Sequence, residues 1–229
     1  MKIKVKSKIY FAISGLFIVL FGALTFLVLN VDVQPIGPEG SAVGLSKING
    51  ALHDAIGSHM EWYGVTSVLG IVGILSTLGF ALLGLIELIT RKSFSKVDKD
   101  LYVLGAFCVL TAVLYFTFEL IIINYRPVLI DGALEASFPS SHTMLICFTM
   151  GTAMAQTRSR IKNKGLMISA QIVAVAIMAV TVVGRFVSGV HWFTDIIGGL
   201  LLGGAIVTLY LACVSLLTKK ENSSLTHED

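Results

Sequence analysis

The residues best suited to chemistry lie at 184–195, a polar segment between two long apolar runs. His191 and Asp195 are four residues apart, so a helix through both would place them on one face. The carboxylate could then accept from one imidazole nitrogen and leave the other unprotonated, as a nucleophile or base requires. Arg185 carries a planar set of donors that suits a phosphate. A histidine–aspartate pair alone fits a structural hydrogen bond equally well.

Two further polar clusters share another interval between apolar runs. The first is Arg126 with the proline after it, and the second runs from Pro139 through Ser140 and Ser141 to His142. A proline followed by serine is typical of a helix start, with Ser140 as the candidate N-cap. The first amides of such a helix form a natural anion site. These clusters therefore add an arginine, a histidine and an anion-binding turn to the first segment.

In order and spacing, the three clusters resemble the motifs of the type-2 phosphatidic-acid phosphatase superfamily of integral-membrane lipid phosphatases. The family motifs are lysine-x6-arginine-proline, proline-serine-glycine-histidine and serine-arginine-x5-histidine-x3-aspartate. Their counterparts here are Arg126-Pro127, Pro139-Ser140-x-His142 and Arg185-x5-His191-x3-Asp195. Three positions depart, with Glu119 in place of the lysine, Ser141 in place of the glycine and Gly184 in place of the serine. The resemblance covers the motif-bearing core, about residues 101–217.

The resemblance implies a role in phosphoryl transfer for most of these residues. His191 would be the nucleophile that forms a phosphohistidine, Asp195 would orient it, and His142 would protonate the leaving alkoxide and then activate water. The substrate phosphate would be bound by Arg126, Ser140, Ser141 and Arg185. The histidines and acids lack the spacing of metal ligands, so we expect a metal-independent site without a cofactor.

Glu119 places a potential anion where the family has a cation. An ionisable residue at membrane depth is expected to be functional or paired. Two interpretations stay open for it: a salt bridge with Arg126, or a hydrogen bond to a hydroxyl of the substrate's head group.

The composition indicates a membrane protein, because 55% of the 229 residues are hydrophobic, 14% are charged and the mean hydropathy is +0.85. We expect six spans, at about residues 9–29, 62–90, 101–123, 140–157, 165–187 and 192–217. Apolar residues at three- and four-residue steps between 45 and 60 predict an amphipathic helix. It would lie on the membrane surface or pack on the bundle. The predicted fold is all-α and polytopic, with one domain over residues 1–229.

The basic residues separate by side once six spans are assumed. Both termini then lie together with fourteen of the seventeen basic residues, and only Lys47, Arg126 and Arg185 lie opposite. By the positive-inside rule the terminal side is cytoplasmic, so the motifs face the outside of the cell membrane. We expect the bilayer and a lipid substrate as partners, and neither nucleic acid nor an obligate protein partner.

The expected function is a phosphatase of phospholipid metabolism that hydrolyses phosphatidylglycerophosphate or a similar lipid phosphate. The resemblance extends equally to undecaprenyl-pyrophosphate phosphatases, and a phosphoryl transferase would use the same intermediate. The loss of a cation at Glu119 should disfavour the more highly charged pyrophosphate. A rival interpretation, motivated by Glu119 and Gly184, is an inactive membrane protein that binds lipid phosphates.

Overall fold

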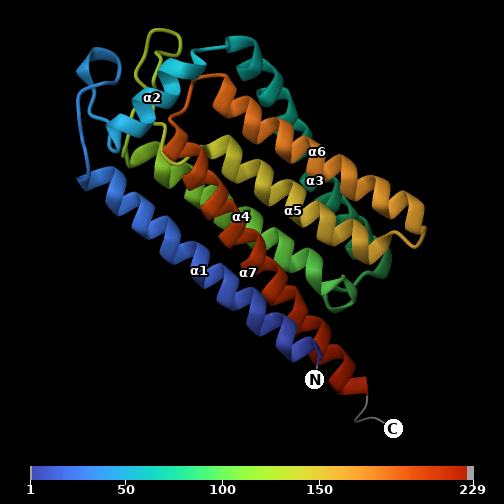
Figure 1. The fold of residues 1–229 in the computed structure, drawn as a ribbon. Helices are drawn as coiled ribbons and strands as arrows, with labels where there is room; N and C mark the ends of the chain where they lie inside the picture. The colour runs from blue at the N-terminus through green and yellow to red at the C-terminus, as the bar shows by residue number, and fades with distance from the viewer. Residues whose placement is uncertain (1, 226–229) are drawn as a thin grey trace.

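The computed structural model describes residues 2–225, which form seven α-helices and two single-turn 3-10 helices and contain no β-strand (Figure 1). The α-helices are α1 (Lys2–Asn30), α2 (Ser46–Ile56), α3 (Met60–Arg91), α4 (Lys99–Leu120), α5 (Ser141–Arg160), α6 (Lys164–Val187) and α7 (Phe193–Leu225). The short ones are Pro38–Gly40 and Phe94–Lys96. The predicted all-α class is confirmed.

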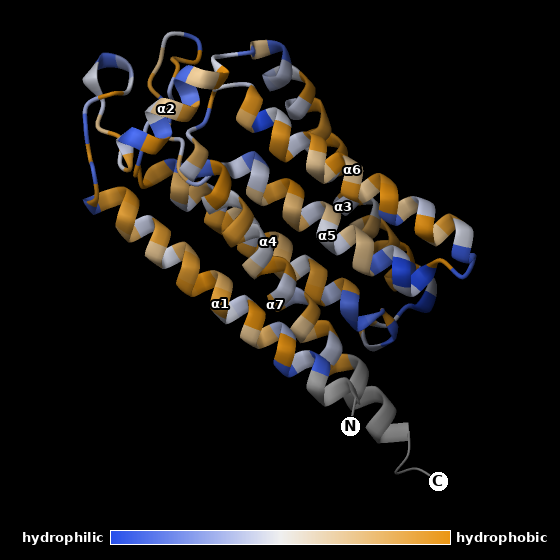
Figure 2. Ribbon diagram, viewed as in Figure 1, coloured by the Kyte–Doolittle hydropathy of each residue, from blue (hydrophilic) through white to orange (hydrophobic). Residues whose placement is uncertain are grey.

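Five of these helices, α1, α3, α4, α6 and α7, are long and apolar enough to cross a membrane. Apolar side chains cover their outer surfaces, and Leu16, Val68 and Ile172 are each more than half exposed (Figure 2). Such an extent of exposed apolar surface is stable in contact with lipid and unfavourable in water. The chain is therefore a multi-pass membrane protein.

Helix α5 corresponds to the remaining predicted span, but its hydropathy does not mark it as one. It packs against α3, α4, α6 and α7, so other helices surround it instead of lipid. This position lets it carry polar side chains whose hydrogen bonds stay inside the bundle. Thr152 donates to the Phe148 carbonyl, and the buried Gln156 donates to the hydroxyl of Tyr210. Length and hydropathy therefore support five spans and leave the sixth as a proposal.

Glycines on α7 let this helix lie directly against the start of α5. A Cβ at Gly199 would lie 2.7 Å from the carbonyl oxygen of Ser140, and one at Gly203 would lie 2.7 Å from the Cβ of Cys147. Both distances are far shorter than a carbon atom tolerates, so only glycine allows this separation of the two helices. The contact places the first turn of α5 beside the first turn of α7.

Helix α2 packs on the bundle through its polar face. Asn49 is completely buried and accepts from the backbone amide of Thr194 at 3.2 Å, while its own amide donates to the Thr194 hydroxyl at 3.0 Å. An amide in the first turn of α7 is thereby capped by a side chain from another helix. Ile48, from the predicted apolar stripe, is 47% exposed on the outer side. The structure therefore shows α2 packed on the bundle, and its position at the membrane surface stays a prediction.

The segments that carry the three motifs lie at one end of the bundle (Figure 1). The connections at 121–140 and 188–192 lie at the same end as α2, whereas the start of α1 and the end of α7 lie at the opposite end together with the α3–α4 and α5–α6 connections. The elements thus gather the polar motif residues at one end of an apolar bundle.

We predict that Gly203→Ala destabilises the protein by about 1–3 kcal/mol, because its methyl group would force α7 away from α5. The measurement is thermal unfolding of the detergent-solubilised protein. Gly105→Ala is the matched control, since a Cβ there meets no atom within 4 Å and α4 would gain helix propensity. Equal midpoints for the two variants would contradict this account of the α5–α7 contact.

Candidate functional site

His191 and Asp195 are brought together by the capping turn of α7 and not by a shared helix face, because α7 begins at Phe193. Asp195 is the third residue of the helix, and its Oδ2 accepts from the backbone amide of Trp192, the N-cap, at 2.8 Å. The same oxygen lies 3.6 Å from Nδ1 of His191. This is a close contact that is longer than a hydrogen bond. The two groups are adjacent, and the expected helical pairing is replaced by a cap.

The histidine of this pair is buried without a hydrogen-bond partner. The His191 and Asp195 side chains are 1% and 0% exposed, and neither ring nitrogen of His191 has a partner at hydrogen-bond geometry within residues 2–225, although the Ser137 backbone lies close enough to influence its pKa. Burial, followed by the charges of Arg126 and Arg185, holds the pKa of His191 well below its usual range. The imidazole is therefore neutral at physiological pH, which is the form that a nucleophile or base requires.

Arg126 lies in the connection between α4 and α5, which an indole hydrogen bond ties to the turn that carries His191. Trp192 donates from its ring to the carbonyl of Tyr125 at 2.7 Å. Arg126 is nearly buried, and its Nε lies 3.0 Å from Oε2 of Glu135. Its Nη1 has no hydrogen-bond partner within the described chain. The carboxylate that pairs with Arg126 is therefore Glu135, and the salt bridge considered for Glu119 is not formed.

Arg185 occupies the last turn of α6 and is completely buried. Its Nη2 donates to the Ser67 hydroxyl at 2.9 Å, and its guanidinium carbon lies 4.6 Å from the ring centroid of Tyr63. Nε and Nη1 have no partner in the described part of the protein. Unpaired buried donors of a charged group are unfavourable, so such an arrangement favours a bound anion. A phosphate matches the planar guanidinium.

Ser140 is the N-cap of α5, as predicted. Its hydroxyl oxygen accepts from the Thr143 amide at 3.4 Å, and its own amide donates to the backbone carbonyl of Asp195 at 2.9 Å. The hydroxyl of Ser140 therefore caps α5, and its backbone amide holds α5 to α7. His142 lies in the same first turn, and its Nδ1 is buried without a partner among the described residues. The ring of His142 packs against Gly70 of α3, 3.4 Å from where a Cβ would lie.

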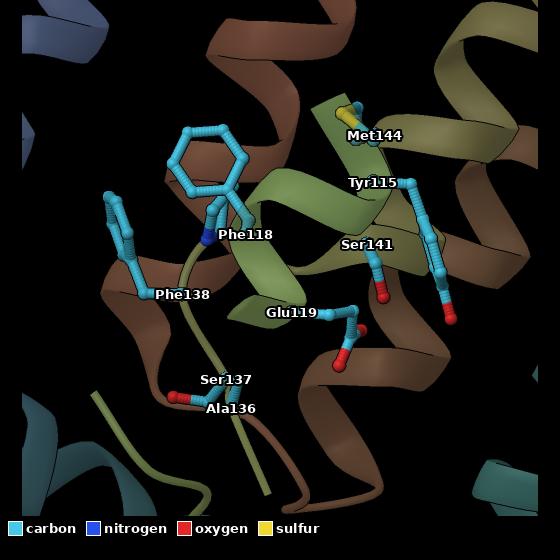
Figure 3. A pocket seen from close by; sticks show the side chains of 9 residues that line it. Tyr115, Phe118, Glu119, Ala136, Ser137, Phe138, Ser141 and Met144 are labelled. Carbon is cyan, nitrogen blue, oxygen red and sulfur yellow. The ribbon is translucent and has the colours of Figure 1, made fainter. Parts of the chain in front are cut away.

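An open pocket of about 440 Å³ borders this cluster at Arg126 and His142. Arg126, Glu135, Glu119, Ser141 and His142 contribute to its wall. Figure 3 shows a smaller neighbouring pocket that shares Tyr115, Glu119 and Ser141 with the open one, and the polar ends of these three side chains face the same space. Ser141 therefore faces the pocket, and two carboxylates stand near the one arginine that reaches its wall.

The predicted site residues separate into two groups in the structure. The buried group comprises Arg126, Ser140, Arg185, His191 and Asp195, and the pocket wall adds Glu119, Ser141 and His142. Residues 2–225 contain no cluster of three or more histidine, cysteine or acidic side chains arranged to hold a metal ion.

Sequence reasoning missed Glu135, Tyr63 and Ser67, which contact the two arginines. Glu135 follows Arg126 by nine residues in the same polar connection. The opposite charges of the two residues could have predicted their ion pair. Tyr63 and Ser67 lie on an apolar helix far from Arg185 in the sequence, where no local pattern marks them.

The comparisons with known proteins agree with this arrangement. The model of the PAP2 superfamily matches residues 75–219, which is more than half of the chain. Among solved structures, the chain is similar to the crystal structure of "the first transmembrane PAP2 type phosphatidylglycerolphosphate phosphatase from Bacillus subtilis". The two share 19% identity and a TM-score of 0.56, over 87% of this chain and 94% of that chain. No curated protein gives a significant match. The chain belongs to the PAP2 superfamily.

Proposed function

We propose that the protein is a lipid phosphate phosphatase that removes the terminal phosphate of phosphatidylglycerophosphate or a similar lipid phosphate. The observation that carries this proposal is the pair of buried arginines, Arg126 and Arg185, whose donors lack partners beside the neutral His191. The family and the fold support it, since the Bacillus subtilis protein of similar fold is described as a phosphatidylglycerolphosphate phosphatase.

In the proposed reaction, Nε2 of His191 attacks the phosphorus atom, because Nδ1 faces the carboxylate of Asp195. The ester P–O bond breaks, and His142 protonates the departing alkoxide. Asp195 stabilises the positive imidazolium of the phosphohistidine. His142 then takes a proton from water, whose oxygen attacks the same phosphorus atom and releases inorganic phosphate from His191.

The arginines neutralise the phosphoryl oxygens during both steps, as metal ions do in other phosphoryl transferases. We therefore propose that the reaction needs neither a metal ion nor another cofactor. The first-turn amides of α5, at Ser141 and His142, complete the proposed phosphate site.

We propose a single domain over residues 1–229 with six spans, α5 being the fourth. Both termini are then cytoplasmic, and the pocket opens on the extracytoplasmic face of the cell membrane, as the basic residues predict. The partners in this proposal are the bilayer and the lipid phosphate, without nucleic acid or an obligate protein partner.

The phosphohistidine would serve an undecaprenyl-pyrophosphate phosphatase or a phosphoryl transferase equally well. Glu119 favours the monophosphate among these, because its carboxylate lines the pocket without pairing with Arg126. A pyrophosphate brings more negative charge toward that carboxylate, whereas a glycerol hydroxyl could donate to it.

The central variant for the proposed function is His191→Ala, which should abolish phosphate release from short-chain phosphatidylglycerophosphate, with a loss of at least about 10⁴-fold typical of removing a nucleophile. The detergent-purified protein is assayed with a chelator present, and activity of the parent should survive it. His59→Ala is the matched control, because His59 is exposed and, within the described chain, its side chain pairs with Glu61 and bonds the Ile56 carbonyl, both outside the site. If the parent releases no phosphate from any lipid phosphate, the rival of an inactive binding protein is favoured.

The proposed orientation predicts that a cysteine replacing the exposed Ala133 reacts with a membrane-impermeant maleimide in intact cells. Lys162→Cys, exposed in the α5–α6 connection, should react only after permeabilisation. The parent gives the background, since its three cysteines are buried or half-buried. The reverse pattern of labelling would mean that the orientation is inverted.

For the substrate, we predict that Glu119→Lys shifts preference from phosphatidylglycerophosphate toward undecaprenyl pyrophosphate by about tenfold, as expected for exchanging one nearby charge. The measurement is the ratio of kcat/KM values for the two lipids, with phosphatidic acid as a third substrate. Glu61→Lys makes the same charge change at an exposed position outside the pocket and should leave the ratio unchanged. An unmoved ratio in Glu119→Lys would refute the argument from charge.

A further inference from the structure

Helix α3 supplies two side chains to Arg185 from outside the region that the family model matches. Tyr63 and Ser67 lie before residue 75, where that match begins. The two residues are one helical turn apart, so they present themselves on the same face of α3. Both contact a guanidinium whose Nε and Nη1 have no hydrogen-bond partner among residues 2–225.

The direction of the hydrogen bonds at Ser67 is determined by its surroundings. Its Oγ lies 2.8 Å from the carbonyl oxygen of Tyr63 and 2.9 Å from Nη2 of Arg185. A hydroxyl has a single hydrogen, and a guanidinium can only donate. The hydroxyl therefore donates to the carbonyl and accepts from Arg185. The ring of Tyr63 adds a cation–π contact to the face of the same guanidinium.

The residue before Arg185 lies in close contact with α3. The family motif has a serine at position 184, where this chain has Gly184. A Cβ at Gly184 would lie 2.6 Å from Cγ2 of Thr66 and 3.0 Å from the ring of Trp62. Side chains of α3 thus fill the space that a serine would need, and the neighbouring Ser67 places a hydroxyl on the arginine.

We propose that Ser67, together with Tyr63, is a positioning residue for the proposed phosphatase reaction. The two residues hold one nitrogen and one face of the Arg185 guanidinium, and they leave Nε and Nη1 for the substrate's phosphate. Without them, a buried arginine on a long side chain would lose its orientation toward the phosphate. This inference rests on the proposed function and adds residues that no motif contains.

The test compares Ser67→Ala, Ser67→Thr and Ser76→Ala in detergent. Ser67→Ala should lower kcat/KM for phosphatidylglycerophosphate and weaken inhibition by orthovanadate, a phosphate analogue, each by about ten- to hundredfold, as for a lost hydrogen bond to a charged group. Ser67→Thr keeps the hydroxyl and should recover most of both losses. Ser76→Ala removes a serine of α3 whose hydroxyl donates to the Gly73 carbonyl of the same helix, and it should change neither quantity.

A double variant separates positioning from a general loss of structure. In an Arg185→Gln background, Ser67→Ala should cause no further weakening of orthovanadate binding, measured by the ligand's effect on the unfolding temperature. Equal kcat/KM and equal orthovanadate inhibition in Ser67→Ala and the parent would overturn the inference while leaving the proposed function intact. If the parent hydrolyses no lipid phosphate, the proposed function fails. In that case, weaker orthovanadate binding by Ser67→Ala than by the parent supports the inference, and equal binding overturns it.

Discussion

The site depends on burying positive charge without giving it a full set of protein partners. Arg185 is fully buried and Arg126 nearly so, yet each keeps donors unpaired within the described chain. Desolvating such donors costs several kcal/mol when nothing binds them, and a bound anion offsets that cost. Glu135 holds the side chain of Arg126 in place, and Ser67 and Tyr63 hold that of Arg185. The arrangement is therefore favourable when a tetrahedral anion is bound, and it is unfavourable when the buried donors are left unpaired.

The scaffold around the site is built to bring three distant segments to one end of the bundle. Glycines on α7 let it approach the first turn of α5, and Ser140 then bonds the backbone of Asp195. Asn49 of α2 caps the first turn of α7. Trp192 joins the start of α7 to the connection that carries Arg126. Since α5 lies at the centre, its polar first turn is shielded from lipid by its neighbours.

Much of this could be predicted from the sequence, because the signals involved are local. Long apolar runs predicted most helix bounds within about three residues, although α1 begins seven residues before the predicted span and α7 ends eight residues after it. The order of the motifs predicted which polar residues belong together. Ser140 was recognisable as a cap, since capping depends on neighbouring residues. The pairing of His191 with Asp195 through a capping turn was missed, because the same spacing also suits a helix face. The α3 contacts to Arg185 were missed because they depend on how two helices pack, which neither sequence segment encodes alone.

The central claim is that His191 receives the phosphoryl group, and the most direct measurement is its covalent trapping. Protein turning over ³²P-labelled phosphatidylglycerophosphate is quenched in alkali, where phosphohistidine survives, and its peptides are mapped. The account predicts label on the peptide that contains His191, and no label on that peptide in His191→Ala. Turnover without labelled protein, or label on a different residue, would contradict it.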